Sequence, residues 1–463
     1  MNNHQIFVDL QLLKKYDRSG PRYTSYPTAP NFHTGIGPAE YRQHLVQDEG
    51  AAAHQDLSLY VHLPFCDTLC YFCGCNMMVT HDRDKVEEYL DYLEKEMRLL
   101  AATLDSSRKV VQLHWGGGTP THLKPGQIRQ LGDMLHHYFP FREEAEISVE
   151  IDPRELTRDH MAALRDVGFN RCSMGVQDFQ EEVQVAVNRI QPEAITRQAV
   201  DWARELGFGS VNIDLMYGLP HQTRTTFAST LETVLTLDPD RLAIFNYAHL
   251  PQIFKHQRVI LDEWLPVPEE KLELLKLSIE TLTAADYIYI GMDHFAKPDD
   301  ELAQAMEKGT LYRNFQGYST HAGLNLIAMG MSSISGLSAL YVQNHKTLGE
   351  YYQALDAGHL PTARGVELTP DDRLRREVIV DLMCNFVLKK ARIEDKYAIE
   401  FDTYFADALH QLEPFVEDNL VELTSDKISV TTRGRLLIRN IVMNFDAYLQ
   451  KKGDKKPQFS RTV

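Results

Sequence analysis

The feature that most constrains the fold is a regular alternation of short apolar runs with helical patterns. In the helical patterns, as in 86–104 and 195–207, apolar residues recur at i, i+3 and i+4. Because strands that alternate with helices form repeated βαβ units, the sequence predicts an α/β fold with a parallel sheet. The candidate strands cover residues 57–65, 110–117, 146–152, 170–177, 210–218 and 241–250. Six units are too few for a closed eight-stranded barrel, so the right-handed crossovers predict a partial barrel or a doubly wound sheet.

Each expected strand ends in a polar or glycine-rich stretch. Examples are GGGTPTH at 116–122, MGVQDF at 174–179 and DLMYGLP at 214–220. In barrels, the loops at the carboxyl ends of the strands carry the chemistry. Six such ends favour a barrel-like closure around one shared site.

The first of these stretches is PFCDTLCYFCGCN, residues 64–76, which contains four of the six cysteines of the chain. A structural zinc site usually takes two ligand pairs separated by about a dozen residues or more, and the sequence has no second pair of this kind. Closely spaced thiolates are typical of iron–sulfur clusters. We therefore favour an iron–sulfur cluster over zinc.

The spacing C-x3-C-x2-C, with Phe72 before the third cysteine, resembles the signature of the radical S-adenosylmethionine (SAM) superfamily. Longer blocks resemble one family within it, the oxygen-independent coproporphyrinogen III oxidases. They include SGPRYTSYPTA at 19–29, QLHWGGGTPTHL at 112–123 and EIDPRE at 150–155, together with the ending CxC of the cysteine loop. The resemblance covers nearly the whole chain.

The resemblance implies a [4Fe–4S] cluster held by Cys66, Cys70 and Cys73, with one iron left open for the amino and carboxylate groups of SAM. A fourth thiolate would close that position, so Cys75 is not expected to be a ligand. Cys172 and Cys384 fall within apolar patterns, which predicts buried thiols without a role in the site.

The resemblance also implies two SAM molecules in one pocket. Glu150 would bind the cationic end of the first SAM, Asp214 would accept hydrogen bonds from ribose hydroxyls of the second, and Arg189 would bind a carboxylate. The positions that match the first SAM site are Tyr60, Gly117, Glu150 and Ile334. Those that match the second are Phe72, Gly118, Thr119, Gln177, Arg189, Asp214 and Ala248. The catalytic positions implied are Tyr60, Glu150 and Gln316.

The implied reaction belongs to haem biosynthesis. A 5′-deoxyadenosyl radical made from SAM would take a hydrogen atom from the β-carbon of a propionate side chain. Loss of carbon dioxide and one electron would leave a vinyl group, and two rounds would convert coproporphyrinogen III to protoporphyrinogen IX.

The substrate implied carries four carboxylates, whereas the chain has a net charge of −17. A locally basic pocket is therefore needed, and Arg22, Arg154 and Arg313 are candidates for it. Two alternatives remain for Tyr23 and Tyr26 in the leader: they lie over the site as a lid, or they pack as part of an extended arm.

The chain is expected to divide into an N-terminal arm or lid (1–40), a radical SAM partial barrel with extensions (41–366) and a mainly helical, winged-helix-like domain (367–463). The acidic total argues against nucleic acid as a partner. No apolar run approaches the length of a membrane span, which predicts a cytoplasmic protein. An electron-donating reductase or flavodoxin and a monomeric state are also expected.

Two other functions are weighed against the oxidase. One is a non-catalytic haem chaperone or haem-utilisation protein of the same superfamily, which usually lacks the CxC ending and the YTSYP leader. The other is a winged-helix regulator that senses its cluster. A basic recognition helix would support the regulator, and the sequence has none.

Overall fold

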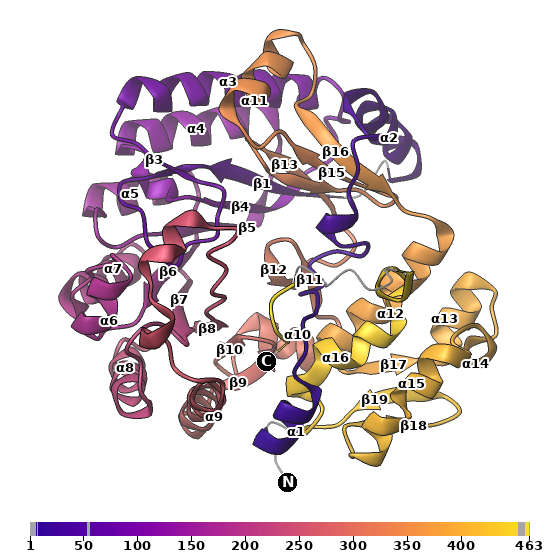
Figure 1. Cartoon of the computed structure of the whole chain (residues 1–463). Coiled ribbons are helices and arrows are strands. Elements are labelled where there is room, and N and C mark those ends of the chain that lie inside the picture. The colour runs from indigo at the N-terminus through magenta and orange to yellow at the C-terminus, as the bar shows by residue number, and fades with distance from the viewer. Residues whose placement is uncertain (1–5, 7, 53–55, 452–458, 463) are drawn as a thin grey trace.

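The structure, a computed structural model, describes residues 6, 8–52, 56–451 and 459–462. Its centre is a twelve-stranded sheet in the order β16-β15-β14-β13-β1-β4-β5-β6-β7-β8-β10-β9. Figure 1 shows the sheet curving around an interior that the chain's last third closes on the other side. The sheet stays open, so the predicted α/β partial barrel is confirmed.

Six consecutive strands of the sheet are those that the sequence predicts. They run parallel to one another, each paired with the next. These strands are β1 (Leu57–Leu63), β4 (Val110–Gly117), β5 (Phe141–Ile151), β6 (Arg171–Gln177), β7 (Ser210–Tyr217) and β8 (Arg241–Asn246). The main differences are at β5, which begins five residues before the predicted start at 146, and at β8, which ends four residues before the predicted limit of 250, where the chain enters a loop.

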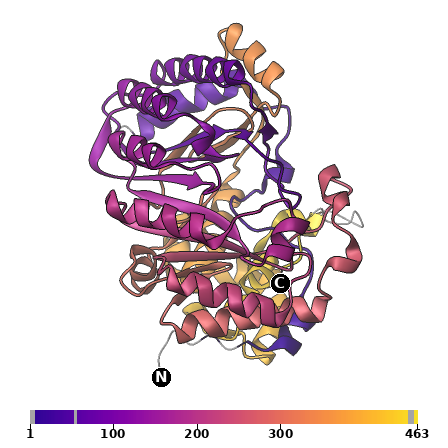
Figure 2. The same ribbon diagram turned by 90° about the vertical axis from the view of Figure 1, so that its left-hand side faces the viewer.

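Helices cover the outer face of these strands, as Figure 2 shows from the side. They are α3 (Arg83–Ala101), α4 (Pro125–Tyr138), α5 (Arg158–Asp166), α6 (Glu181–Ala186), α7 (Glu193–Glu205), α8 (Arg224–Thr236) and α9 (Pro268–Ala284). Helix α3 begins where the Asp82 side chain accepts a hydrogen bond from the backbone of Asp84. Its buried residues, among them Leu90, Leu93 and Met97, recur at helical spacing and pack into the core beneath the sheet.

Both edges of the sheet extend beyond the six predicted strands. At one edge β13 (Asn325–Met329) pairs parallel with β1, and β14 (Ile334–Gly336), β15 (Leu340–Asn344) and β16 (Thr362–Glu367) follow antiparallel. At the other edge β10 (His294–Ala296) and β9 (Ile288–Gly291) are antiparallel. These strands are three to six residues long and most of them pair antiparallel, so the βαβ pattern gave no sign of them.

A separate hairpin, β11 (Tyr312–Asn314) and β12 (Gly317–Ser319), lies on the inner side of the sheet (Figure 1). Its turn residue Gln316 donates to the backbone oxygen of Leu59 in β1, and Tyr318 packs against His294 in β10. The hairpin therefore bridges two strands that are far apart in the sheet.

The last part of the chain is mainly helical, as predicted, and it contains a small three-stranded sheet. Its elements include α12 (Pro370–Asn385), β17 (Val387–Lys389), α13 (Lys390–Tyr397), α15 (Ala406–Glu417), β18 (Val421–Leu423), β19 (Lys427–Val430) and α16 (Ile438–Val442). Strand β19 lies between β17 and β18.

The leader runs between this C-terminal part and the sheet (Figure 1). It begins with α1 (Leu10–Tyr16) and continues in extended form. Tyr23 donates to Asp446, and the Tyr26 hydroxyl accepts from the backbone of Ala447. Both tyrosines are buried in the hydrophobic core of the C-terminal part, which favours the packed arm among the two alternatives for these side chains.

Within the described residues, no helix is both long enough and apolar enough to cross a membrane.

Candidate functional site

A hollow lies at the carboxyl ends of the parallel strands. Side chains and backbone from the ends of β4, β5, β6 and β7 and from the cysteine loop after β1 meet there. The predicted site residues that line it are Cys66, Cys70, Phe72, Cys73, Gly117, Gly118, Thr119, Glu150, Gln177, Arg189 and Asp214, and Cys75 lines it too. Residues up to about 150 positions apart in sequence are thus brought to one place, as parallel strands require of their carboxyl ends.

The cysteine loop is fixed at both of its ends. Strand β2 (Phe65–Cys66) pairs with β3 (Met78–Val79) and closes the loop at its base. The chain just after β4 supports the loop, since the backbone N–H of Thr119 donates to the backbone oxygen of Phe65 over 2.7 Å. A Cβ atom on Gly118 would lie 2.6 Å from that same oxygen, so only glycine fits there.

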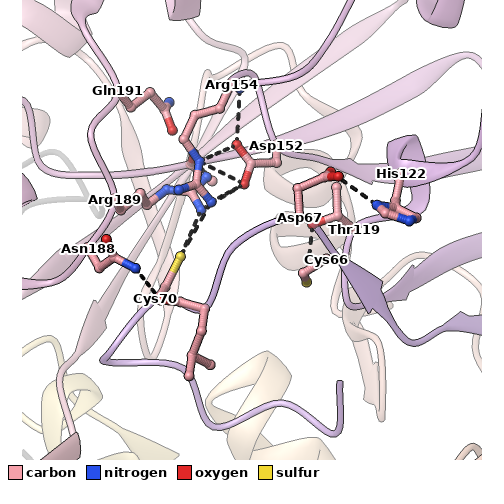
Figure 3. Close-up of polar contacts among 12 residues, drawn as sticks. Cys66, Asp67, Cys70, Thr119, His122, Asp152, Arg154, Asn188, Arg189 and Gln191 are labelled. Atoms are coloured by element: carbon pink, nitrogen blue, oxygen red, sulfur yellow. Dashed lines mark hydrogen bonds and ion pairs between the residues drawn. The ribbon is translucent and has the colours of Figure 1, made fainter. Parts of the chain in front are cut away.

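Two arginines lie beside the buried thiol of Cys70 (Figure 3). Its Sγ atom is 3.4 Å from Arg154 Nη2 and 3.6 Å from Arg189 Nη1. Asp152 holds both guanidinium groups, with Oδ2 2.6 Å from Arg154 and 3.0 Å from Arg189. The arrangement places positive charge next to a sulfur atom that would be negative as a metal ligand.

The thiols of Cys66 and Cys73 have different surroundings. Burial raises the pKa of Cys66 to about 12, although a hydrogen bond with Thr119 Oγ1 at 3.4 Å lowers it in part. The hydrogen bond with Cys75 lowers the pKa of Cys73, whose Sγ atom also accepts from the Cys75 backbone at 3.4 Å. The closely spaced thiols of this loop, next to two guanidinium groups and a hollow, suit an iron–sulfur cluster.

Glu150 presents a carboxylate to this hollow. Burial raises its pKa, but hydrogen bonds from His114 and from the backbone of Gly117 outweigh that effect and hold the pKa below its ordinary value. The carboxylate is therefore charged at neutral pH and suits an ammonium group.

Asp214 lies within β7, before the end of the strand. Burial raises its pKa to about 6, while Ser173 Oγ and Asn212 Nδ2 donate to its oxygens over 2.9 and 2.7 Å. Two donors fix the orientation of the carboxylate without neutralising its charge, so it keeps acceptor capacity for a hydroxyl group.

Four predicted site residues do not line this hollow. Tyr60 stacks on His114, with ring centroids 5.9 Å apart, and His114 in turn contacts Glu150. Gln316 is bound to the backbone of Leu59, next to Tyr60. Ala248 lies in the loop after β8. Ile334, in β14, packs against an apolar group around Phe32 and Tyr341.

Some contacts of the site carry no signal in the sequence. His256 Nε2 is 2.7 Å from the backbone oxygen of Cys73, and Gln257 donates to that of Phe72. His62 Nε2 lies 2.9 Å from the backbone oxygen of Asn76. These contacts join positions up to 185 residues apart, which no local pattern encodes. The spacing of two between Glu150 and Asp152 predicts that both carboxylates point the same way from a strand, but it does not reveal the arginine partners of Asp152.

The comparisons with known proteins agree with this geometry. The model of the radical SAM superfamily matches residues 60–234, and the model described as the HemN C-terminal domain matches residues 368–437. The oxygen-independent coproporphyrinogen III oxidase of Escherichia coli strain K12 is 51% identical to the chain over 463 residues, 100% of both. The enzyme of that name from Pseudomonas aeruginosa is 49% identical over 457 residues, 98% of each.

A solved structure of coproporphyrinogen III oxidase (HemN) from Escherichia coli, described as a radical SAM enzyme, is also similar. It superposes with a TM-score of 0.92 at 50% sequence identity and covers 96% of this chain and 100% of its own.

Proposed function

The chain belongs to the oxygen-independent coproporphyrinogen III oxidases of the radical SAM superfamily, and from this membership we propose how its residues carry out that activity. The reaction is the oxidative decarboxylation of two propionate side chains of coproporphyrinogen III to the vinyl groups of protoporphyrinogen IX, a step of haem biosynthesis. The single observation that carries the proposal is the meeting of three cysteines, a glycine-lined strand end and the charged Glu150 around one hollow.

Cys66, Cys70 and Cys73 would hold one [4Fe–4S] cluster, and Cys75 would remain free. When bound, the cluster and SAM supply a 5′-deoxyadenosyl radical that abstracts hydrogen. Around them, Asp152 fixes Arg154 and Arg189 beside Cys70. The backbone of Thr119, just after β4, supports the loop at Phe65. The protein thus contributes position and charge and excludes water, while the cofactors supply the reactive group.

Glu150 would bind the ammonium group of a first SAM, with Gly117 allowing close approach and with Tyr60 and Ile334 as further contacts. Support comes from the lowered pKa of Glu150 and from its bond to Gly117. Because Tyr60 stacks on His114, it would act by orienting the imidazole that donates to Glu150.

A second SAM would lie beside the first, in contact with Phe72, Gly118, Thr119, Gln177, Arg189, Asp214 and Ala248. The oriented carboxylate of Asp214 suits a ribose hydroxyl. Arg189 already pairs with Asp152, so it would offer a bound carboxylate its remaining N–H groups. Gln316, at the turn of the inner hairpin, would face the tetrapyrrole.

We propose further that the chain works as a cytoplasmic monomer, reduced by a flavodoxin or a similar reductase. The division into an arm (1–40), a barrel (41–366) and a C-terminal domain (367–463) is part of the same proposal. The end of β16 at Glu367 and the start of α12 at Pro370 support its last boundary.

An anaerobic turnover assay tests the proposal. The reconstituted protein is mixed with dithionite, SAM and coproporphyrinogen III, and 5′-deoxyadenosine and tetrapyrrole products are quantified. We expect a divinyl product with one 5′-deoxyadenosine for each vinyl group formed. An assembled cluster with tight haem binding and no vinyl product would reject the oxidase in favour of a haem chaperone.

A further inference from the structure

A group of cationic and aromatic side chains lies outside the hollow, on the inner side of the sheet. It comprises Arg22 from the leader, Phe245 at the end of β8, His294 in β10, and Arg313 and Tyr318 from the two strands of the inner hairpin. We call these five residues the inner cationic group.

Its members form one continuous row. The Arg313 guanidinium lies 4.7 Å from the ring centroid of Tyr318, which meets His294 edge-on at 5.2 Å. His294 in turn meets Phe245 edge-on at 5.9 Å, and the Arg22 guanidinium lies 5.8 Å from the Phe245 centroid. Two cations therefore flank three rings, an arrangement that suits a flat ligand with anionic side chains.

Several polar atoms in this row are buried without a partner. Arg313 is only 5% exposed, yet its Nε and Nη1 atoms have no hydrogen-bond acceptor in the part of the chain that the structure describes. The same holds for Nδ1 of His294. A buried guanidinium N–H without an acceptor is strongly unfavourable, so the two Arg313 atoms point to an acceptor that the described part of the chain does not supply.

Positive charge exceeds negative charge around the row. Arg22 pairs with Asp293. Arg439 lies close by and donates to the backbone oxygens of Gly20, Pro21 and Arg461, which carry no charge. Burial and the nearby charges of Arg313 and Arg22 lower the pKa of His294 well below its ordinary value, which agrees with an excess of cations. An anionic ligand would balance this charge.

The other candidate for such a role, Arg154, differs in kind. Its guanidinium group donates to both oxygens of Asp152 and lies against Cys70, so it is already neutralised within the cluster environment.

We propose that the inner cationic group binds a carboxylate of the substrate, in particular of a propionate that is not reacting, while Tyr318 and Phe245 pack against a pyrrole ring. Arg313 and His294 donate to the carboxylate, and Arg22 adds charge from the leader. This inference rests on the proposed function. It makes the inner hairpin the element that orients the tetrapyrrole, since its turn also reaches β1 beside Tyr60.

Equilibrium binding tests this without turnover. The reconstituted protein is titrated with coproporphyrin III and with its tetramethyl ester, whose carboxylates are masked. We expect wild type to prefer the free acid, and Arg313→Gln to weaken free-acid binding about tenfold while leaving the ester unchanged. Arg313→Lys, which restores the charge with a single amine, should recover part of the affinity.

Arg165→Gln provides the matched control, because Arg165 also lies over an aromatic ring, Phe208, but on helix α5. Its affinity for both ligands should equal that of wild type. The inference would be overturned if Arg313→Gln lost affinity equally for both ligands, or lost affinity for neither. Failure of the proposed function would be separate, as wild type would then bind coproporphyrin and form no vinyl group.

Discussion

Individual residues decide whether the cysteine loop holds a cluster with an open iron. Cys73 and Cys75 are two positions apart, line the same hollow and share a hydrogen bond, so geometry at the level of the loop does not separate them. The distinction comes from the expected chemistry, in which a fourth thiolate would occupy the position needed by SAM.

A pair of serine substitutions tests that distinction. After anaerobic reconstitution, Cys75→Ser should keep the iron and sulfide content of wild type, because it removes no ligand. Cys73→Ser should lose most of both, since two thiolates remain. Iron and sulfide analysis together with the visible absorption of the cluster gives the result, and equal loss in both variants would assign Cys75 as a ligand.

At this scale the sequence predicts well the residues that lie within motifs. The cysteines, Gly117–Thr119 and Glu150 meet as their strand-end positions suggest. The sequence predicts poorly what depends on distant partners. Arg154 illustrates this, since its pairing with Asp152 turns a candidate substrate ligand into part of the cluster environment.

Among the elements, the segment after β8 that contains residues 254–257 contacts the cysteine loop and holds it in place. His256 and Gln257 bond to the backbone oxygens of Cys73 and Phe72, and the ring of Phe254 lies against Gly74. The sequence shows a strand and then a loop here, and the contact with the cysteines arises only through folding.

Removing one of these contacts should loosen the loop. In His256→Ala, we expect iron release to an added chelator to be several-fold faster than in wild type, because the Cys73 carbonyl loses its partner. The rate is measured under anaerobic conditions from the decay of cluster absorbance. His137→Ala, which changes an exposed histidine of α4, is the control and should release iron at the wild-type rate. Identical rates in all three proteins would contradict the role given to this segment.

A buried carboxylate links helix α3 to the edge strands of the sheet. Glu96 accepts hydrogen bonds from the Tyr351 hydroxyl at 2.5 Å, the Asn344 amide at 2.7 Å and the Gly330 backbone at 2.8 Å. Burial raises its pKa to about 7 despite these donors. The turn it holds, starting at Gly330, leads into β14 and contacts His62 through Ser332.

This raised pKa predicts a pH dependence of stability. The folded protein holds the Glu96 proton more tightly than the unfolded chain, whose value is near 4.5, so the contribution is complete below that pH and is lost as pH rises through 7. Glu96→Gln does not titrate. Between pH 5 and pH 8, wild type should therefore lose stability relative to Glu96→Gln, by at most about 3 kcal/mol. Urea unfolding midpoints of both proteins measure this, and parallel midpoints across the range would contradict it.

For the whole molecule, the alternation of strands and helices predicts the six-stranded centre, because the periodicity is local and strong. The same reasoning missed the edge strands and the inner hairpin. Strand β13 pairs with β1 over a long sequence separation, and the two hairpin strands are only three residues long, too short to show a period. It also left the leader open between a lid and a packed arm. The burial of Tyr23 and Tyr26 follows from their contacts with Asp446 and Ala447, more than 400 residues away.

The fold brings two functional regions, the cluster hollow and the inner cationic group, to its inner surface. The strand ends assemble the cluster hollow on one part of the inner surface, and the hairpin, β10 and the leader place the inner cationic group on another. A substrate anchored at one and reacting at the other would present a propionate carbon to the radical.

Isotope transfer shows whether the radical takes its hydrogen atom from the β-carbon of a substrate propionate. Coproporphyrinogen III carrying deuterium at the β-carbons of its propionates is turned over anaerobically with dithionite and SAM, and the 5′-deoxyadenosine is analysed by mass spectrometry. We expect each 5′-deoxyadenosine formed with a vinyl group to carry one deuterium from the substrate. Vinyl product accompanied by unlabelled 5′-deoxyadenosine would contradict it, because the hydrogen would then have come from another position.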